Sequence, residues 1–231
     1  NLNRVLTLKS IELSNEVVKS YDNYDFERVI RLIMPFVIND ISAFYLDYTK
    51  DILYILDEHN FERRSVQSTI YDILLRLLKL LTPIIPHTTS EVYQYLPHKE
   101  FEDIYLEDMP KVYEHKFSKY LEDFELFEEV REEFLKQIEI ARSEKLVSKT
   151  LQADVIITMP KTHLDAINEL EINLLQVLMV ASIDVLVGDM IKVEVTKSNN
   201  LTCSRCWNLV PNLNEDEVCP RCEDVLKKGA K

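Results

Sequence analysis

The sequence predicts a mainly α fold: a helical bundle over residues 1–110, a small α/β module over 111–200 and a compact tail over 201–231. Three observations lead to this prediction. Apolar residues recur at helical spacing through the first hundred residues. The chain has only two glycines in 231 residues, which disfavours tight hairpin arrays and glycine-rich phosphate loops. All four cysteines lie after residue 200.

The first segment reads as successive helices. Apolar residues from Leu2 to Val18 follow a helical period, and Asp25 offers an N-cap to a helix that runs from Phe26 to Leu46, with a bend expected at Pro35. The region Ser65–Leu81 is apolar on most of its surface, which is typical of a helix buried in a bundle.

The end of that buried helix and the start of the next are marked by prolines and hydroxyl side chains. The run from Thr82 to Pro86 ends the helix, since proline cannot continue it. Thr88, with Glu91 three residues later, matches a capping box, so we expect the next helix to start there.

The middle segment changes to a mixed α/β pattern. Apolar residues from Phe124 to Ala141 mark an amphipathic helix with an acidic outer face. The remaining expected elements are a strand at Ala153–Met159, a helix at Leu164–Met179, and two strands, Ile183–Val187 and Met190–Thr196, joined as a hairpin through a type II′ turn at Gly188-Asp189.

The cysteines form two Cys-x-x-Cys pairs, Cys203 with Cys206 and Cys219 with Cys222. Four thiolates in this pattern can close around one zinc ion, which would be structural because no coordination position stays open. The alternative is two disulfides or unrelated thiols, but nothing at the N-terminus resembles a signal peptide, and a redox Cys-x-x-Cys would need a thioredoxin-like setting that is missing.

Two residues at the first pair are candidates for nucleic-acid contact: Arg205 lies between its cysteines and Trp207 directly follows Cys206. Trp207, the only tryptophan, either covers the metal or lies on the surface as a platform on which an unpaired base stacks. In the second interpretation Arg205 reaches a phosphate or a guanine edge. Both interpretations of Trp207 stay open at this point.

Arg63 and Arg64 precede Ser65 at the expected start of the buried helix. Paired arginines at a helix N-terminus can hold phosphate, because free N–H groups point outward there. The alternative is that they pair with acidic neighbours, which are numerous in this chain.

Composition limits the remaining classes of function. The five histidines, at positions 59, 87, 98, 115 and 163, are scattered, and we recognise no catalytic constellation. The net charge of −13 argues against general nucleic-acid affinity. No run of 18 uncharged apolar residues occurs, so we expect no membrane span. The chain begins at Asn1 rather than Met, so we expect a piece of a longer protein.

Several motifs together resemble a known family, the anticodon-binding domain of class Ia aminoacyl-tRNA synthetases. The motifs are Tyr24-Asp25-Phe26, the run Asp40–Asp47 followed by Lys50-Asp51, the run Arg63–Gln67, and the run Leu81–Thr88 continuing to Glu91. The four-cysteine tail with Cys206-Trp207 makes the chain similar to bacterial isoleucyl-tRNA synthetases in particular, because the valyl, leucyl and methionyl members do not end this way.

The resemblance implies ATP-dependent attachment of isoleucine to tRNA by a cytoplasmic ligase. The catalytic Rossmann and editing domains would lie before Asn1, so this piece would hold no catalytic residue and would use no ATP itself. The resemblance also implies one structural zinc and contact with the anticodon stem-loop by Arg205 and Trp207. We expect a monomer that binds neither membrane nor DNA.

Two rival interpretations belong to other classes. Some DNA glycosylases end in a similar four-cysteine module, which would make the chain a DNA-repair or regulatory protein. A basic DNA-facing surface would then be needed, and the acidic excess disfavours it. The other rival is an adaptor in which the cysteine module docks a protein partner.

Overall fold

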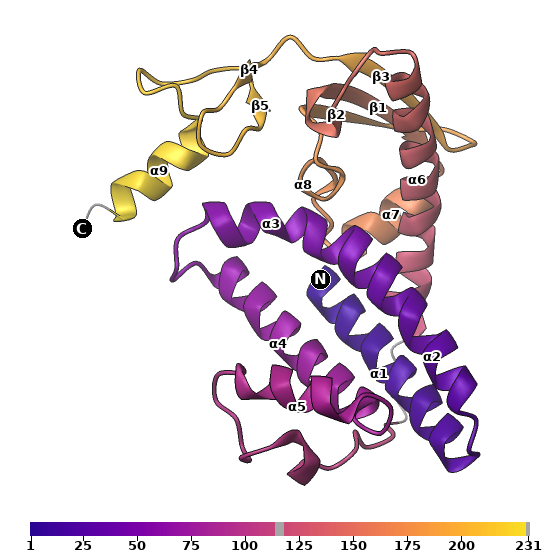
Figure 1. Ribbon diagram of the computed structural model, residues 1–231. Coiled ribbons are helices and arrows are strands. Elements are labelled where there is room, and N and C mark those ends of the chain that lie inside the picture. The colour runs from indigo at the N-terminus through magenta and orange to yellow at the C-terminus, as the bar shows by residue number, and fades with distance from the viewer. Residues whose placement is uncertain (114–117, 230–231) are drawn as a thin grey trace. The chain divides into compact units, whose positions relative to one another are not determined.

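The structure, a computed structural model, describes residues 1–113 and 118–229 (Figure 1). It forms two compact units. The bundle unit comprises Asn3–Asp47 and Arg64–Phe117, and the sheet unit comprises Asn1–Leu2, Tyr48–Arg63 and Ser118–Lys231. The predicted mainly α fold with a small sheet region is confirmed. The predicted division into 1–110, 111–200 and 201–231 stays a prediction.

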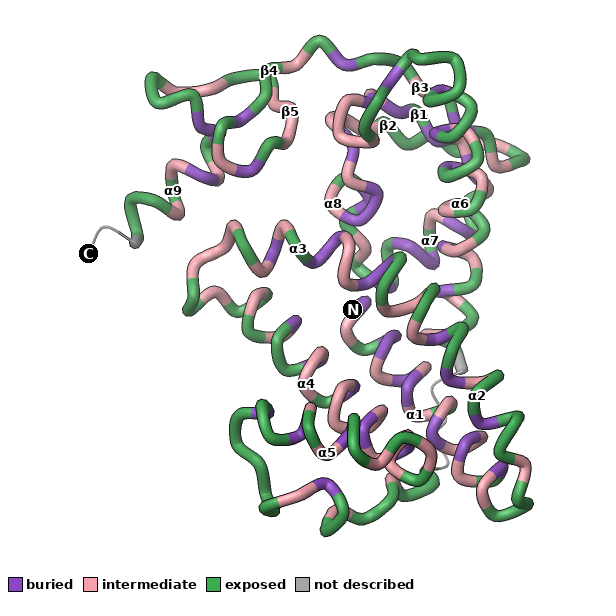
Figure 2. Tube along the Cα trace, viewed as in Figure 1, coloured by how far each residue is buried: buried purple, intermediate pink, exposed green. Residues whose placement is uncertain are grey.

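Helices account for nearly all of the ordered structure before residue 114. Their bounds are α1 Leu2–Asp22, α2 Phe26–Pro35, the π-helix η1 Phe36–Tyr45, α3 Leu46–Ile55, α4 Phe61–Leu81, α5 Pro86–Gln94 and the 3₁₀ turn η2 Ile104–Leu106. The bundle core includes a cluster around Val17, Val29, Ile33 and Leu80 and another around Leu78, Tyr93, Leu96 and Ile104. In Figure 2 buried residues recur along these helices between exposed ones, as amphipathic spacing requires.

The start of α2 confirms the predicted cap, since the Asp25 carboxylate accepts a hydrogen bond from the Arg28 N–H at 3.1 Å. At Pro35 the chain stays helical but changes its hydrogen-bond pattern. Proline has no N–H to donate, and the turns that follow are wider. The Leu46 N–H accordingly bonds to the carbonyl of Ile41, five residues back.

The helical stretch Phe26–Ile55 spans 30 residues and is long and apolar enough to cross a membrane by length and composition. This differs from the expectation that no segment qualifies, because that expectation counted only uncharged runs. Within the bundle unit Val29 and Ile33 of this stretch lie in the core, and Asp40 pairs with Lys9 of α1 at 2.6 Å. These contacts are those of a bundle helix, which satisfies the same test of length and composition.

Two predicted helix starts are wrong by a few residues. The helix expected from Ser65 begins at Phe61, because the Asn60 side chain accepts hydrogen bonds from the Glu62 and Arg63 N–H groups and caps the helix earlier. The helix expected from Thr88 begins at Pro86, where the missing N–H of proline is harmless. The capping-box interpretation of Thr88 is therefore wrong.

The sheet unit places one long helix against a three-stranded sheet. Its elements before residue 200 are α6 Ser118–Ser143, the 3₁₀ turn η3 Thr150–Gln152, β1 Ala153–Met159, α7 Lys161–Glu169, α8 Leu174–Leu178, β2 Ser182–Val187 and β3 Lys192–Lys197. The predicted amphipathic helix is confirmed, and the residues that define its apolar face are buried: Phe124, Phe127, Val130, Phe134, Ile138 and Ala141. Helix α6 contacts α7 and β3 (Figure 1).

The predicted helix Leu164–Met179 is wrong, because the chain forms two helices there. Glu171 adopts a left-handed conformation with φ of 51° just after α7. The N–H groups of Glu171 and Ile172 bond back to the carbonyls of Asn168 and Ile167, which is a Schellman ending. Such endings favour glycine, so the glutamate at this position concealed the boundary. Asn173 then caps α8.

The predicted hairpin is also wrong. The strand order is β2-β1-β3, so β1 lies between the two strands that were expected to pair. Strand β1 is parallel to β2 and antiparallel to β3. The Gly188 N–H donates to the Met159 carbonyl at 2.9 Å and extends the parallel ladder. A Cβ on residue 188 would lie 2.5 Å from Cγ2 of Thr158, so glycine is needed here for close approach rather than for a turn.

We predict that Gly188→Ala destabilises the sheet unit by about 1–3 kcal/mol, because the added methyl group overlaps a β-branched side chain in the strand beside it. Thr158→Ser removes that methyl group of Thr158, so the double variant should recover much of the loss. Urea unfolding of the two single variants and the double variant measures this. Equal destabilisation by Gly188→Ala in both backgrounds would contradict the steric explanation.

A nearly buried carboxylate fastens the segment after α5 to the bundle. The Glu107 side chain is 6% exposed, and it lies 2.8 Å from the Lys79 ammonium. It also accepts a hydrogen bond from the Tyr93 hydroxyl at 2.8 Å. Burial by itself raises the pKa of Glu107, but the hydrogen bonds from Lys79 and Tyr93 outweigh it and hold the pKa below the usual value.

We predict that Glu107→Gln lowers the free energy of unfolding at pH 7 by about 1–2 kcal/mol, since two polar partners lose the charge they face. A depressed folded-state pKa stabilises the fold above the unfolded-state pKa, and this contribution disappears as the pH falls through the folded-state value. The difference between wild type and variant should therefore shrink on acidification. Denaturant unfolding at pH 7 and pH 3 measures it, with the exposed Glu100→Gln as control. A difference that does not change with pH would contradict the ionic explanation.

Candidate metal centre and nucleic-acid interface

The last described part of the chain, residues 201–229, is called the cysteine-rich tail below. It contains a two-stranded ribbon, β4 Leu201–Thr202 with β5 Leu209–Val210, followed by helix α9 Pro220–Gly229. Cys203 and Cys206 lie in the loop that joins the two strands, and Cys219 and Cys222 lie at the start of α9. All four are buried and none is in a disulfide.

The four sulfur atoms lie within 4.8 Å of one another, and Cys206 Sγ is 3.8 Å from Cys219 Sγ. A tetrahedral zinc site with Zn–S bonds of about 2.3 Å separates its sulfurs by about 3.8 Å. A disulfide would need about 2.05 Å. The geometry therefore fits a metal held by four thiolates. Among residues 1–113 and 118–229 this is the one group of His, Cys, Asp and Glu side chains close enough to hold a metal ion.

Local hydrogen bonds favour the thiolate form of Cys203 over that of Cys206 and Cys222. Burial raises the pKa of the Cys203 thiol, but backbone N–H groups, that of Cys219 among them at 3.2 Å, outweigh burial and lower its pKa to about 6. Burial raises the pKa of Cys206 and of Cys222. Four buried sulfurs cannot all carry negative charge without a cation among them, so this arrangement favours a bound metal.

Trp207 lies in the loop of the first cysteine pair, and its backbone N–H donates to the Cys203 carbonyl at 2.9 Å. Its φ of 62° is left-handed, and its side chain is 71% exposed. The apolar residues that pack against the cysteine cluster are instead Ile55, Val210 and Leu213. The indole is thus positioned as an exposed aromatic surface, whereas other side chains cover the sulfurs.

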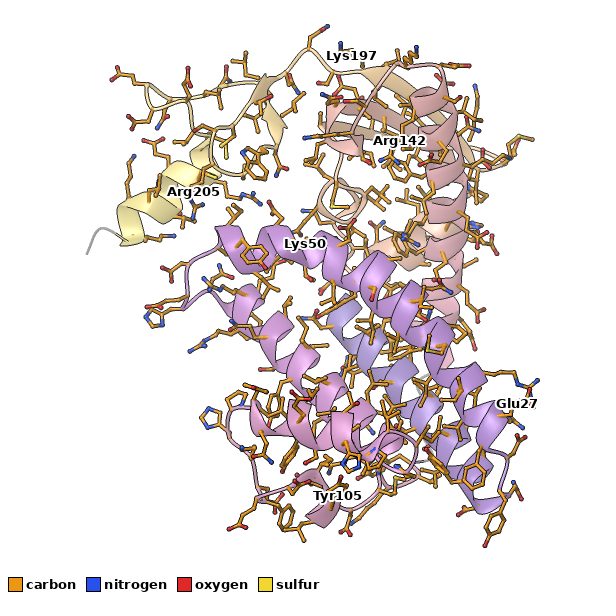
Figure 3. All side chains as sticks on the ribbon, viewed as in Figure 1. Glu27, Lys50, Tyr105, Arg142, Lys197 and Arg205 are labelled. Carbon is orange, nitrogen blue, oxygen red and sulfur yellow. The ribbon has the colours of Figure 1, made fainter. Side chains whose placement is uncertain are left out.

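Arg205 is half-buried and contacts both the cysteine cluster and helix α3. Its Nη1 lies 3.6 Å from Cys222 Sγ, and its Nη2 donates to the Ile55 carbonyl at 3.0 Å. A cation at the C-terminal end of a helix also faces the negative end of the helix dipole. Figure 3 labels this residue beside the tail.

A second arginine of the tail meets helix α3 one turn earlier. Both nitrogens at the end of Arg221 bond the Asp51 carboxylate, at 2.5 and 2.7 Å, and Asn208 donates to the same carboxylate at 3.4 Å. The hydrogen bond to Asp51 raises the pKa of Arg221 further above its ordinary value. The motif Lys50-Asp51 is part of the family resemblance, but the sequence alone gave Asp51 no role.

A pocket of about 430 Å³ lies where the tail meets the end of α3 and the loop that follows it. Its lining residues are Tyr54, Leu56, Asp57, Glu58, Arg63, Arg205, Val225 and Leu226. The structure therefore brings together Arg63 and Arg205, which the sequence offered as separate candidates. Sequence analysis missed Tyr54, whose side chain is 78% exposed.

Arg63 and Arg64, at the start of α4, lie in different environments. Arg63 lies inside the first turn and not before the helix, and its Nη1 donates to the Leu56 carbonyl at 2.8 Å. Its buried Nε atom has no hydrogen-bond partner among the described residues. Arg64 is exposed, lies 3.5 Å from the Gln67 side-chain oxygen and does not line the pocket.

The histidines do not converge on a site within the described chain. His163 of α7 contacts Glu129 of α6 at 2.9 Å, and His59 contacts the neighbouring Glu58 at 3.4 Å. Of the five histidines named above, His115 lies outside the described residues.

Comparisons with known proteins agree with this arrangement. A family model described as the anticodon-binding domain of tRNA ligase matches residues 4–157. An isoleucine–tRNA ligase of Acholeplasma laidlawii is 48% identical over 98% of this chain. Ligases of the same name from Onion yellows phytoplasma and Bacillus cytotoxicus are 41% and 34% identical over 98% and 99% of it. The chain spans about a quarter of the length of these relatives: 25%, 25% and 26%. The chain therefore belongs to the family of anticodon-binding domains of tRNA ligases.

Proposed function

We propose that this chain is the region of an isoleucine–tRNA ligase that binds the anticodon arm of its tRNA. The relatives named above are isoleucine–tRNA ligases, and the chain aligns with them over nearly its whole length. The attachment of isoleucine with ATP, and the editing of errors, would then belong to the remaining three-quarters of such a ligase. No catalytic residue is assigned to the present chain.

The observation that carries this proposal is the junction of the tail with α3. The pocket there brings together two guanidinium groups, that of Arg205 from the tail and that of Arg63 from α4. The tail also carries the exposed indole of Trp207, two residues after Arg205. An unpaired base stacks on an exposed aromatic ring, and a guanidinium pairs with phosphate or with a guanine edge. Arg64, exposed beside Arg63 in the chain, is proposed as an additional phosphate contact.

The net charge of −13 does not oppose a local RNA contact. Attraction between exposed charges fades within about 8 Å at physiological salt, so the groups next to the pocket decide the local interaction. Asp57 and Glu58 at the same pocket would repel a misplaced phosphate and so restrict where the backbone can lie. We propose that the region acts as a monomer in the cytoplasm, without affinity for DNA or membranes.

We propose zinc as the metal of the four-cysteine cluster. Thiolates favour zinc over hard cations such as magnesium, and four of them leave no position open for a substrate. The metal would therefore stabilise the tail and would take no part in chemistry. A tail of about thirty residues is too small to fold on its own apolar core.

Removal of the metal should unfold the tail and spare the bundle. In zinc-finger peptides the metal contributes on the order of 10–16 kcal/mol, far more than a tail of this size gains from other contacts. We expect a chelator to abolish the fixed environment of Trp207 while the far-ultraviolet helical signal stays nearly intact. Tryptophan fluorescence and circular dichroism measure both, and zinc should restore the fluorescence. Loss of most helical signal on chelation would contradict separate folding of the tail.

Replacement of Trp207 by alanine should weaken binding of an isoleucine tRNA anticodon stem-loop about ten-fold, which matches the energy of one stacked base. Trp207→Phe keeps an aromatic face and should lose less. A titration at fixed salt concentration measures this, with duplex DNA as the competing ligand. An unchanged affinity for the alanine variant would remove Trp207 from the interface. Equal affinity for duplex DNA and for the stem-loop would instead favour a general nucleic-acid-binding function.

A further inference from the structure

The attachment of the cysteine-rich tail to α3 depends on one carboxylate. Asp51 is 19% exposed and receives a bidentate hydrogen-bonded ion pair from Arg221, together with the longer contact from Asn208. Bidentate pairs between arginine and carboxylate are strong and fix the relative orientation of the two groups. Asp51 therefore meets both the β4–β5 loop and α9 of the tail.

The neighbouring residue on the same face of α3 completes this attachment. Ile55 lies four positions after Asp51, which is one helical turn. Its carbonyl accepts the hydrogen bond from Arg205, and its side chain packs against the cysteine cluster. Three polar side chains of the tail thus hold two residues of α3.

The pocket exists only while this attachment holds. Its lining comes from two parts of the chain that are far apart in sequence, residues 54–63 and residues 205–226. Arg63 belongs to the first part and Arg205 to the second. If the tail moved off α3, the two guanidinium groups would no longer line one pocket.

We propose that Asp51 is a positioning residue for RNA binding: its ion pair with Arg221 holds the tail on α3, so that Trp207, Arg205 and Arg63 form a single binding surface. This inference rests on the proposed function. Asp51 itself does not contact the RNA, since a carboxylate would repel phosphate.

The sign of the effect separates this role from a simple charge effect. Removal of a carboxylate makes the protein less acidic, which by charge alone would strengthen binding to a polyanion. Loss of the attachment should instead weaken binding, because the RNA must then reassemble the surface at the expense of its own binding energy. Asp51→Ala is thus expected to act against its own change in charge.

The experiment compares Asp51→Ala, Arg221→Ala and the double variant for binding to an isoleucine tRNA anticodon stem-loop at fixed salt. Amide hydrogen exchange of residues 203–229 is measured in the same zinc-loaded samples. We expect each single variant to bind about ten-fold more weakly and to exchange faster in the tail. The double variant should be no worse than either single variant. Asp51→Glu, which keeps the carboxylate, should recover affinity, whereas Asp51→Asn should not. Glu215→Ala, exposed on the same tail, makes the same charge change as a control.

Three results would overturn the proposal. The first is unchanged or tighter RNA binding by Asp51→Ala together with faster exchange, which would mean that the attachment does not position the surface. The second is additive losses in the double variant, which would mean that Asp51 and Arg221 do not act as a pair. The third is loss of zinc from Asp51→Ala, which would make Asp51 a stabiliser of the metal site. If the wild-type chain binds no stem-loop, the proposed function fails, and the exchange data still decide whether Asp51 holds the tail.

Discussion

The arrangement of the C-terminal part of the molecule depends on four sulfur atoms that serve as its hydrophobic core. The buried cluster of the tail consists of the four cysteines and Val218, and the partly buried apolar residues that the structure describes against it are Ile55, Val210 and Leu213. So few apolar residues cannot offset the conformational entropy of ordering about thirty residues. We therefore expect the tail to be ordered only when a metal ion joins the sulfurs, and the contacts between the tail and α3 would depend on that ion as well.

A bound metal ion would also set the net charge of the cysteine cluster, which nearby side chains would have to balance. Four thiolates around a divalent cation carry a net charge of about −2, because each deprotonated cysteine contributes one negative charge. Arg205 and Arg221 lie next to this cluster, and both extend from it to α3. The guanidinium groups that balance the cluster are thus the same groups that attach it. A change in the metal site would therefore alter the contacts of the tail with α3.

Patterns within one element were predictable from the sequence. The cysteine spacing, the amphipathic period of α6 and the strand Ala153–Met159 depend on neighbours in the chain, and each appears in the structure at the expected place. Boundaries were harder, because helix endings that normally use glycine use Tyr24, Lys145 and Glu171 here, with φ near 57°, 61° and 51°. With only two glycines in the chain, this signal was largely missing.

Partners across the chain were not predictable. Gly188-Asp189 resembled a hairpin turn because the strands on either side are adjacent in sequence, yet β1 lies between them and the glycine faces Thr158. The sequence pattern gives no reason to single out Asp51. Its structural role comes from the ion pair with Arg221, which lies 170 positions away in the chain. Tyr54 and Arg63 line a pocket only because the tail lies beside them, which the sequence does not reveal.

The same reasoning explains how an acidic protein can hold an acidic ligand. The overall charge controls long-range encounter, and here it discourages unspecific association with nucleic acid. In the function proposed above, affinity at contact would depend on the few groups that the RNA touches, namely the guanidinium groups of Arg205 and Arg63 at the pocket and the exposed indole of Trp207. Because these groups come from distant segments, we expect them to act together only when the tail is folded around its proposed metal. Selectivity would then follow from shape as well as charge: a rigid duplex cannot place a splayed base on the indole, whereas an RNA loop can.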